Sequence, residues 1–399
     1  MPILKDIKND FQLVKDIVYL DSASVSPTPI PVINEMNEYF LKMPINYGVG
    51  DFALSKKVTK KVDDTRVKLL NLINAPSNWQ AVFTKNTTEA INIVANGLNW
   101  EKDDEIIITN IEHQSNIMPW MRLKKENNIT LKIVQANENG IVEPESILNS
   151  ITSKTKMISI THVSNIYGTI QSVEEIGKIA KNKGIYFMID AAQSAGRIPI
   201  DIQKIGCDFI AICGRKGLMG PQGTGALCSK KSNLEVLKPL TVGSRSGNVR
   251  NNKSYILNST PYCFESGVLN TSGIIGLGKA IDYINEFGIN NILNYNQNLT
   301  NNLISDLLKI NDISIYGCKD YKKNAGIISW NVKNNNSCFV AKKLGEFGNI
   351  LVASGAQGSY LAINNLGIVD VVRTSVHIFN TVEDIEKLHN TMILILNRS

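Results

Sequence analysis

One lysine stands where an apolar run meets a loop rich in glycine. Lys216 follows the run DFIAIC within the stretch CGRKGLMGPQGTGAL, residues 213 to 227. Burying a lysine is costly unless its charge is used or its pKa is lowered, and the glycines let the backbone approach a bulky group. The pattern fits a nucleophilic amine in a site, whereas most lysines at such a place simply close a strand at the surface.

Other polar segments lie at or near the ends of apolar runs. They are KNTTEAIN (85–92), EHQSN (112–116), HVSN (162–165) and DAAQ (190–193). In a doubly wound sheet, the carboxyl ends of neighbouring parallel strands meet in one crevice. We therefore expect these segments to lie beside Lys216, although they are far from it in the sequence.

The residue types at this expected crevice suit pyridoxal phosphate. The cofactor requires a lysine amine for its Schiff base, an anion facing its ring nitrogen, a flat group over its ring and N–H donors for its phosphate. Lys216, Asp190 and His113 supply the first three, and a helix that opens at Asn86 or Thr87 supplies the fourth. Taken alone, Asp190 and Asn86 are equally well explained as helix caps, and His113 as a structural histidine.

The intervening sequence supplies the elements that would hold these residues. Short β-branched runs alternate with helical segments such as SVEEIGKIAKNKG, which predicts an α/β fold with a mostly parallel seven-stranded sheet and helices on both faces. After a polar, turn-rich stretch at 240–270, helices and strands mix as in a smaller α+β domain. We expect an N-terminal segment (1–16) that packs with the small domain, a large cofactor-binding domain (17–265) and a small C-terminal domain (266–399). The strand candidates are AVFT, EIIIT, TLKIVQ, MISITHV, YFMID, FIAIC and GALCS.

Composition argues against several other classes of protein. Of the 399 residues, 42 are basic and 36 acidic, and the net charge of +6 is scattered, so we expect no nucleic-acid partner. We expect no membrane span and a cytoplasmic location, because no run reaches the roughly 18 apolar residues that a bilayer requires. The six cysteines form no C-x-x-C pair, so we expect no structural metal. The motifs of serine hydrolases, P-loop enzymes, zincins and dinucleotide enzymes do not occur.

Read in order, the motifs resemble the class V aminotransferase family of pyridoxal-phosphate enzymes, and most closely its cysteine desulfurase branch. The resemblance spans roughly residues 17–390 and implies a PLP-dependent transferase fold of type I and a homodimer with the active site at the subunit interface. The segments that carry it are YLDSASVSPTP, TTEAINIVA, EHQSNIMPW, HVSNIYGTIQSVEEI, IDAAQSAGRIPIDIQKIGCDF, GRKGLMGPQGTGAL, FESGVLNTSGIIGL and VRTSVHIFNT.

The resemblance also implies a role for each candidate site residue. Lys216 forms the Schiff base, Asp190 faces the pyridinium nitrogen, and His113 stacks on the ring. Arg373 binds the substrate carboxylate, for which a bidentate guanidinium is suited. The remaining positions implied are Gln193 as a donor to the ring oxygen, Asn165 near that oxygen and the substrate, and Asn86, Thr87, Thr88 and Arg215 at the phosphate.

The sequence departs from the branch at several positions. Cys213 and Arg215 stand where a serine and a histidine are usual, and Val268 replaces a threonine that reaches the neighbouring subunit's phosphate. Gly358, in VASGAQGSYLA, stands where the branch carries its persulfide-forming cysteine. Cys338 lies about twenty residues upstream and is a weak candidate to replace that thiol.

These departures leave the reaction open within one class. We expect action on the C–S bond of L-cysteine or a cysteine derivative, either as a desulfurase, with a sulfur-acceptor protein as a further partner, or as a C–S β-lyase. The alternatives are an aminotransferase of a small amino acid and a PLP-binding pseudoenzyme or scaffold in sulfur transfer.

Overall fold

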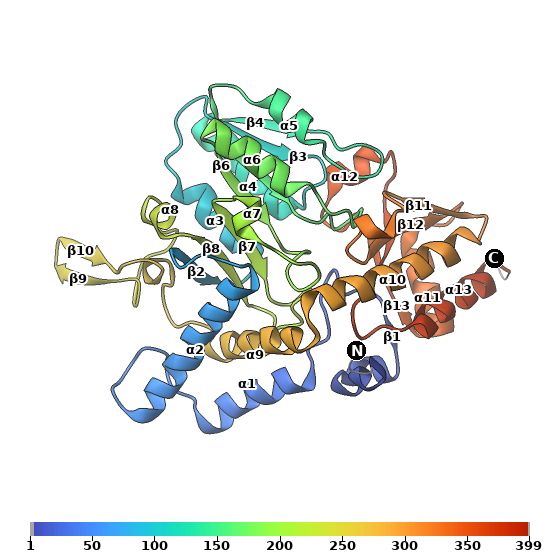
Figure 1. The fold of residues 1–399 in the computed structure, drawn as a ribbon, viewed down its shortest axis with the longest axis horizontal. Coiled ribbons are helices and arrows are strands. Elements are labelled where there is room, and N and C mark those ends of the chain that lie inside the picture. Colours follow the sequence, from blue (N-terminus) through green and yellow to red (C-terminus); the bar gives the residue numbers. More distant parts are fainter. Residues whose placement is uncertain (1–3, 398–399) are drawn as a thin grey trace.

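Seven strands form the central sheet of the computed structural model, which describes residues 4–397 (Figure 1). Across the sheet, the order is β2 (Trp79–Thr84), β8 (Gly225–Lys230), β7 (Phe209–Cys213), β6 (Tyr186–Asp190), β5 (Thr155–Thr161), β3 (Glu105–Thr109) and β4 (Thr130–Val134). β8 is antiparallel to both of its neighbours, and the other adjacent pairs are parallel. The predicted α/β fold with a mostly parallel seven-stranded sheet is therefore confirmed.

Both faces of this sheet are apolar because its strands carry continuous runs of branched side chains. Ile107 of β3 packs into one apolar cluster, and its neighbours Ile106 and Ile108 pack into another on the opposite face. The first cluster includes residues of α2 (Ala53–Leu72), α5 (Pro144–Ser150), α6 (Val173–Lys183), α7 (Ile202–Ile205) and α9 (Thr271–Phe287). The second includes residues of α3 (Thr87–Gly97), α4 (Met118–Asn127) and α8 (Lys231–Glu235). Helix α1 (Ile30–Lys42) packs on α9.

A second, antiparallel sheet lies at the side of the molecule where the chain ends (Figure 1). Its order is β11 (Ile313–Tyr316), β12 (Ile327–Val332), β15 (Val371–Ser375) and β14 (Ala353–Gly355). The helices of this part are α10 (Ile289–Leu308), α11 (Ser337–Gly348), α12 (Tyr360–Asn365) and α13 (Val382–Leu396). Within the described residues, no helix combines the length and apolar character that crossing a bilayer requires.

The N-terminal segment lies against this second sheet and its helices. Two 3-10 helices, Leu4–Asp10 and Gln12–Lys15, lead into β1 (Val18–Tyr19), which pairs in parallel with β13 (Ile350–Leu351). Phe11 packs on Phe379 with ring centroids 5.2 Å apart. The domain boundaries given from the sequence stay predictions. Residues 1–3 and 398–399 of the predicted outer segments lie outside the described residues.

The turn-rich stretch at 240–270 contains an antiparallel hairpin, β9 (Gly247–Asn251) and β10 (Ser254–Leu257), which projects from the rest of the molecule (Figure 1). The sequence analysis did not predict these strands, because their side chains are mostly exposed and so carry no apolar alternation.

Two helical glycines offer a matched test of packing. A Cβ on Gly177 in α6 would lie 1.7 Å from the carbonyl oxygen of Ile205, whereas a Cβ on Gly345 in α11 would meet nothing within 4 Å. We expect Gly177→Ala to lower the free energy of unfolding by about 3 kcal/mol through overpacking, and Gly345→Ala to raise it by about 1 kcal/mol through helix propensity. Urea denaturation followed by circular dichroism measures both, and equal effects would contradict this packing.

Candidate active site

Nine of the predicted site residues line one cavity at the carboxyl ends of the parallel strands. They are Asn86, Thr87, Thr88, His113, Asn165, Asp190, Gln193, Arg215 and Lys216. The helix start of α3 and the segments after β3, β5, β6 and β7 supply them. The cavity lining also contains Ser115, Thr161, Ala192 and Cys213, which were not predicted as site residues. Parallel strand order thus brings together segments that are distant in sequence.

One end of the cavity offers donors to an anion. Asn86 caps α3 by accepting from the backbone N–H of Glu89 at 2.9 Å. The adjacent Thr87 Oγ1 is buried and has no hydrogen-bond partner within residues 4–397. Arg215 brings a guanidinium to the same cavity, and its Nη1 lies 3.5 Å from the Cys213 sulfur. A helix N-terminus, a free hydroxyl and a cation together fit a phosphate group.

Lys216 and Asp190 share the cavity with opposite charges. Lys216 follows β7 and is largely buried, which lowers the pKa of its amine, although Cys213 and Asp190 act in the opposite direction. Asp190 ends β6 and accepts from the backbone N–H of Ala192 at 2.8 Å. Its burial raises the pKa of the carboxyl, and Lys216 counters this effect. The pair supplies an amine of lowered basicity and a buried carboxylate.

His113 carries an uncharged ring in this cavity. Burial and the positive charges of Lys216 and Arg373 lower the pKa of His113 to about 3, so the imidazole is neutral at neutral pH. Its Nδ1 accepts from the backbone N–H of Ser115 at 3.1 Å, which leaves the proton on Nε2. Ser115 was missed from the sequence as a site residue. Its place two residues after His113, in EHQSN, is the signal that could have identified it.

Gln193 is oriented by a contact outside the cavity. Its Nε2 donates to the carbonyl of Ala23 at 2.9 Å, and its Oε1 is buried without a partner. In this orientation the amide offers an acceptor, whereas the resemblance implies a donor to the ring oxygen. Rotation of the amide would offer a donor only by setting Oε1 against the Ala23 carbonyl, which is itself an acceptor.

The loop that carries Gly358 lies directly against His113. Gly358 has a φ of 69°, and a Cβ on it would lie 2.5 Å from His113 Nε2. Its carbonyl accepts from the backbone N–H of Gln114 at 2.7 Å. Asn165 Nδ2 donates to the carbonyl of Gln357 at 3.0 Å, and Asn165 Oδ1 accepts from the Ser359 hydroxyl at 2.8 Å. A cysteine side chain at position 358 therefore has no room unless the loop or His113 moves.

Cys338 is exposed in the first turn of α11. The neighbouring Ser337 accepts from the backbone N–H of Gly355 at 3.1 Å, which connects α11 to the start of the loop that carries Gly358. Cys338 itself is not among the residues that line the cavity.

Arg373 lies in β15, outside the set of residues that line the cavity. It is only 2% exposed, and its Nη2 contacts Asp21 at 3.0 Å and Ser24 at 2.6 Å. Its Nη1 donates to the carbonyl of Asn165 at 3.3 Å, and its Nε is buried without a partner. Among the described residues, the Nε–H therefore has no acceptor. The sequence analysis missed Asp21, which follows β1 in the motif YLDSAS.

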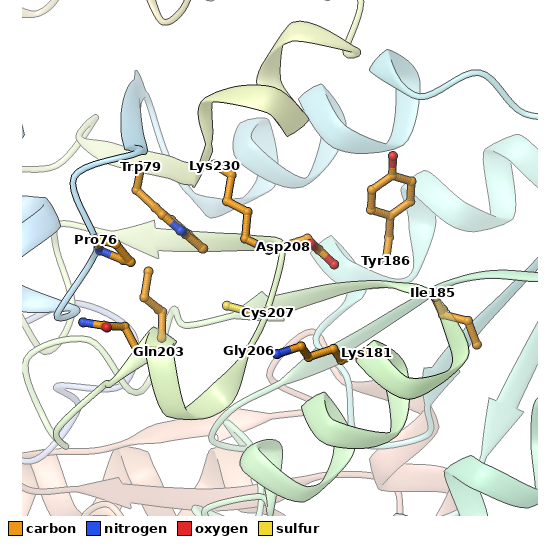
Figure 2. Close-up of a pocket in the computed structure, with 12 residues that line it drawn as sticks. Pro76, Trp79, Lys181, Ile185, Tyr186, Gln203, Gly206, Cys207, Asp208 and Lys230 are labelled. Carbon is orange, nitrogen blue, oxygen red and sulfur yellow. Dashed lines mark hydrogen bonds and ion pairs between the residues drawn. The ribbon is translucent and has the colours of Figure 1, made fainter.

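A larger cavity of about 500 Å³ lies at the opposite, amino edge of the sheet (Figure 2). Trp79 and Tyr186 begin β2 and β6, and Asp208 precedes β7. Asp208 accepts from Lys230 at 3.4 Å and from the backbone N–H of Phe187 at 3.0 Å. Burial raises the pKa of the Cys207 thiol, which keeps it protonated. The arrangement lacks the combination of amine, imidazole and unpartnered hydroxyl that marks the cavity at the carboxyl edge.

Comparison with known proteins identifies the family of the chain. The family model described as aminotransferase class-V matches residues 18–388, and the chain belongs to this family. It is 41% identical to a Methanothermobacter thermautotrophicus protein named "Probable cysteine desulfurase" over 391 residues, 97% of each chain. It is 33% identical over 376 residues to an Escherichia coli protein named "Cysteine desulfurase", covering 93% of this chain and 91% of that protein.

A solved structure gives the same result for the fold. The apo structure of a cysteine desulfurase from Thermococcus onnurineus NA1 superposes with a TM-score of 0.96 at 34% identity, covering 100% of this chain and 99% of that one. The family is pyridoxal-phosphate-dependent, and this chain is an enzyme of the cysteine desulfurase type with that cofactor.

The residues present fit pyridoxal phosphate. The orphaned Thr87 hydroxyl and the helix start suit its phosphate, and the Lys216 amine and Asp190 carboxylate lie in the same cavity. When bound, the cofactor supplies an aldehyde for an amine and an electron-withdrawing ring that stabilises negative charge on a substrate α-carbon.

Substitutions at two glycines of the loop distinguish the steric effect of an added Cβ from the cost of a left-handed backbone conformation. Gly358 and Gly355 have φ values of 69° and 103°, but only a Cβ on Gly358 would meet another atom within 4 Å. We expect both Gly→Ala substitutions to cost about 1–2 kcal/mol of stability through the left-handed backbone. Only Gly358→Ala should shift the His113 imidazole NMR signal, assigned by its loss in His113→Gln. A shift of equal size in Gly355→Ala would contradict the contact.

Proposed function

We propose that this protein is a pyridoxal-phosphate-dependent enzyme that cleaves the C–S bond of L-cysteine or a cysteine derivative. The observation that carries the proposal is the gathering of Lys216, Asp190 and His113 in one cavity beside an anion-binding helix start. The names of the relatives at 33–41% identity support cysteine as the substrate.

The proposal assigns a role to each of four side chains of the site and to the two residues that orient Arg373. The unpartnered Nε–H of Arg373 binds the substrate carboxylate, and Asp21 and Ser24 fix the orientation of the guanidinium. Lys216 Nζ removes the proton from the substrate α-carbon, and burial, which lowers the pKa of this amine, favours its uncharged, basic form. Asp190 would face the ring nitrogen of the cofactor, and the neutral imidazole of His113, in the same cavity, would stack on the ring.

The fate of the sulfur divides the proposal into two routes. β-Elimination breaks the Cβ–S bond, sulfur leaves as sulfide, and hydrolysis gives pyruvate and ammonia. Desulfuration gives alanine and requires a thiolate that attacks the substrate sulfur and keeps it as a persulfide. The close packing of Gly358 on His113 favours elimination, and the names of the relatives favour desulfuration. Cys213 in the cavity lining, or a thiol of an acceptor protein, is the sulfur acceptor on the second route.

Product analysis tests the proposal. The protein reconstituted with pyridoxal phosphate should show a visible absorption band that the cofactor-free protein lacks, and L-cysteine should change that band and release sulfide. Pyruvate in equal amount indicates elimination, and alanine indicates desulfuration. Lys216→Ala should lose the band and at least ~10³-fold of the rate, because the amine is both the attachment point and the base.

A matched control is Lys183→Ala, which removes an exposed lysine from the end of α6. It should behave as the wild-type protein does. A band and a turnover rate that survive in Lys216→Ala would overturn the proposal. Transfer of the amino group to an added keto acid would indicate an aminotransferase, and a stable band without turnover would indicate a scaffold.

We further propose that the protein acts in the cytoplasm as a homodimer. Val249 and Tyr255 on the β9–β10 hairpin and Val268 beside it are 80%, 61% and 75% exposed, which is costly for apolar side chains without a partner. A second copy of the chain would cover them, as the resemblance implies.

Analytical ultracentrifugation should give twice the 44.1 kDa chain mass, and Val249→Lys with Val268→Lys should shift the protein toward monomer. A wild-type protein that sediments as a monomer at micromolar concentration would contradict this prediction.

A further inference from the structure

The peptide groups on both sides of Lys216 are held by segments outside the central sheet. The carbonyl of Arg215 accepts from the backbone N–H of Ser26 at 2.8 Å. The carbonyl of Gly217 lies 3.0 Å from Nε2 of His377, just after β15. Lys216 is therefore positioned by contacts of its neighbours with Ser26, between β1 and α1, and with His377, after β15, besides its own strand.

His377 can only donate in this contact. Its Nδ1 accepts from the backbone N–H of Ile378 at 2.8 Å, so the ring proton is on Nε2 and points at the Gly217 carbonyl. The side chain is fully buried and stacks on Phe379 with centroids 5.7 Å apart and planes 11° apart. Burial, together with the nearby charge of Arg197, lowers the pKa of His377 well below its usual value. The imidazole therefore keeps one proton and one orientation across the working pH range.

Two glycines allow the Lys216 loop to approach closely enough for this bond. A Cβ on Gly217 would lie 2.4 Å from the carbonyl oxygen of Ala195, and a Cβ on Gly196 would lie 2.3 Å from the carbonyl oxygen of Gly217. The carbonyl that His377 reaches is thus packed against backbone and has no room to turn toward water. Without His377 it would be a buried acceptor without a partner.

The same histidine is tied to the strand that carries the carboxylate-binding arginine. His377 lies four residues after Arg373, and its backbone N–H donates to Asn380 Oδ1 at 2.9 Å. The carbonyl of the intervening Val376 accepts from the buried guanidinium of Arg197 at 2.8 Å. The segment after β15 is therefore held by hydrogen bonds on both sides, and the bond from His377 fixes the Gly217 carbonyl relative to this segment.

We propose that His377 is a positioning residue that fixes the Lys216 amine relative to the Arg373 guanidinium. This inference rests on the proposed function, in which one group takes the α-proton and the other the carboxylate. A substrate held by Arg373 presents its α-hydrogen to Lys216 only if the two groups keep a constant separation, and the hydrogen bond from His377 to Gly217 links their two segments.

Three variants separate positioning from stability. His377→Phe keeps an aromatic ring but removes the donor, and His377→Gln keeps an N–H that can reach the Gly217 carbonyl. His389→Phe is the matched control, because His389 also contacts a backbone carbonyl, that of Asp306 at 3.0 Å, in α13 away from the cavity. Thermal unfolding of all three variants gives the stability effect to be subtracted.

Hydrogen exchange of the cofactor-free protein is the first readout. His377→Phe should raise the exchange rate of residues 214–220 about tenfold, because one buried hydrogen bond is lost, and His377→Gln should restore it. In the protein with pyridoxal phosphate, His377→Phe should move the pH midpoint of the visible absorbance by about one unit and lower kcat about tenfold. KM should change less than kcat.

The outcomes distinguish this inference from the proposed function. The inference is overturned if His377→Phe matches His389→Phe in exchange at 214–220, in absorbance midpoint and in kcat, with only the unfolding temperature changed. If the exchange and absorbance results hold while the wild-type protein fails to act on cysteine, the link between His377 and Lys216 is supported and the proposed function fails.

Discussion

The rest of the site depends on the burial of the Lys216 amine at the junction of two sheets. A lysine in water is protonated at neutral pH and cannot act as a nucleophile. Here Lys216 follows β7 into a cavity, so desolvation lowers its pKa, while Asp190 in the same cavity favours the charged amine and opposes that shift. The amine keeps access to a ligand because the cavity at the carboxyl edge of the sheet remains beside it.

Two buried arginines, Arg373 and Arg66, form ion pairs with carboxylates of distant segments. Asp21, just after β1, accepts from Arg373 of β15, and Glu265 accepts from Arg66 of α2 at 2.7 and 3.1 Å. A buried cation of this kind is costly unless it is paired, so each pair also fixes two segments relative to each other. Arg373 keeps one N–H, that of Nε, without an acceptor among the described residues, and the proposed function uses this group.

Glycine governs how closely the loops approach the site. Gly358 allows its loop to lie on the edge of the His113 ring, and Gly217 allows the segment after Lys216 to pack against the backbone at Ala195. In both places a side chain would collide with atoms that position the reacting groups. The absence of a cysteine at position 358 is therefore part of the packing of the site, and restoring the thiol there would require repacking around His113.

The apolar runs of the sequence predicted the central strands and the convergence of the motifs, because buried parallel strands carry continuous apolar runs and a parallel sheet brings the ends of its strands together. The resemblance to the class V aminotransferases added the roles of single residues such as Asn165 and Arg215, and the departure at Gly358. The tertiary structure alone decided the pairing of Asp21 with Arg373, the contact of Gly358 with His113 and the hydrogen bond from His377 to Gly217. These contacts join residues 160 or more positions apart through single polar atoms or a missing Cβ, and no local periodicity in the sequence records such a partner.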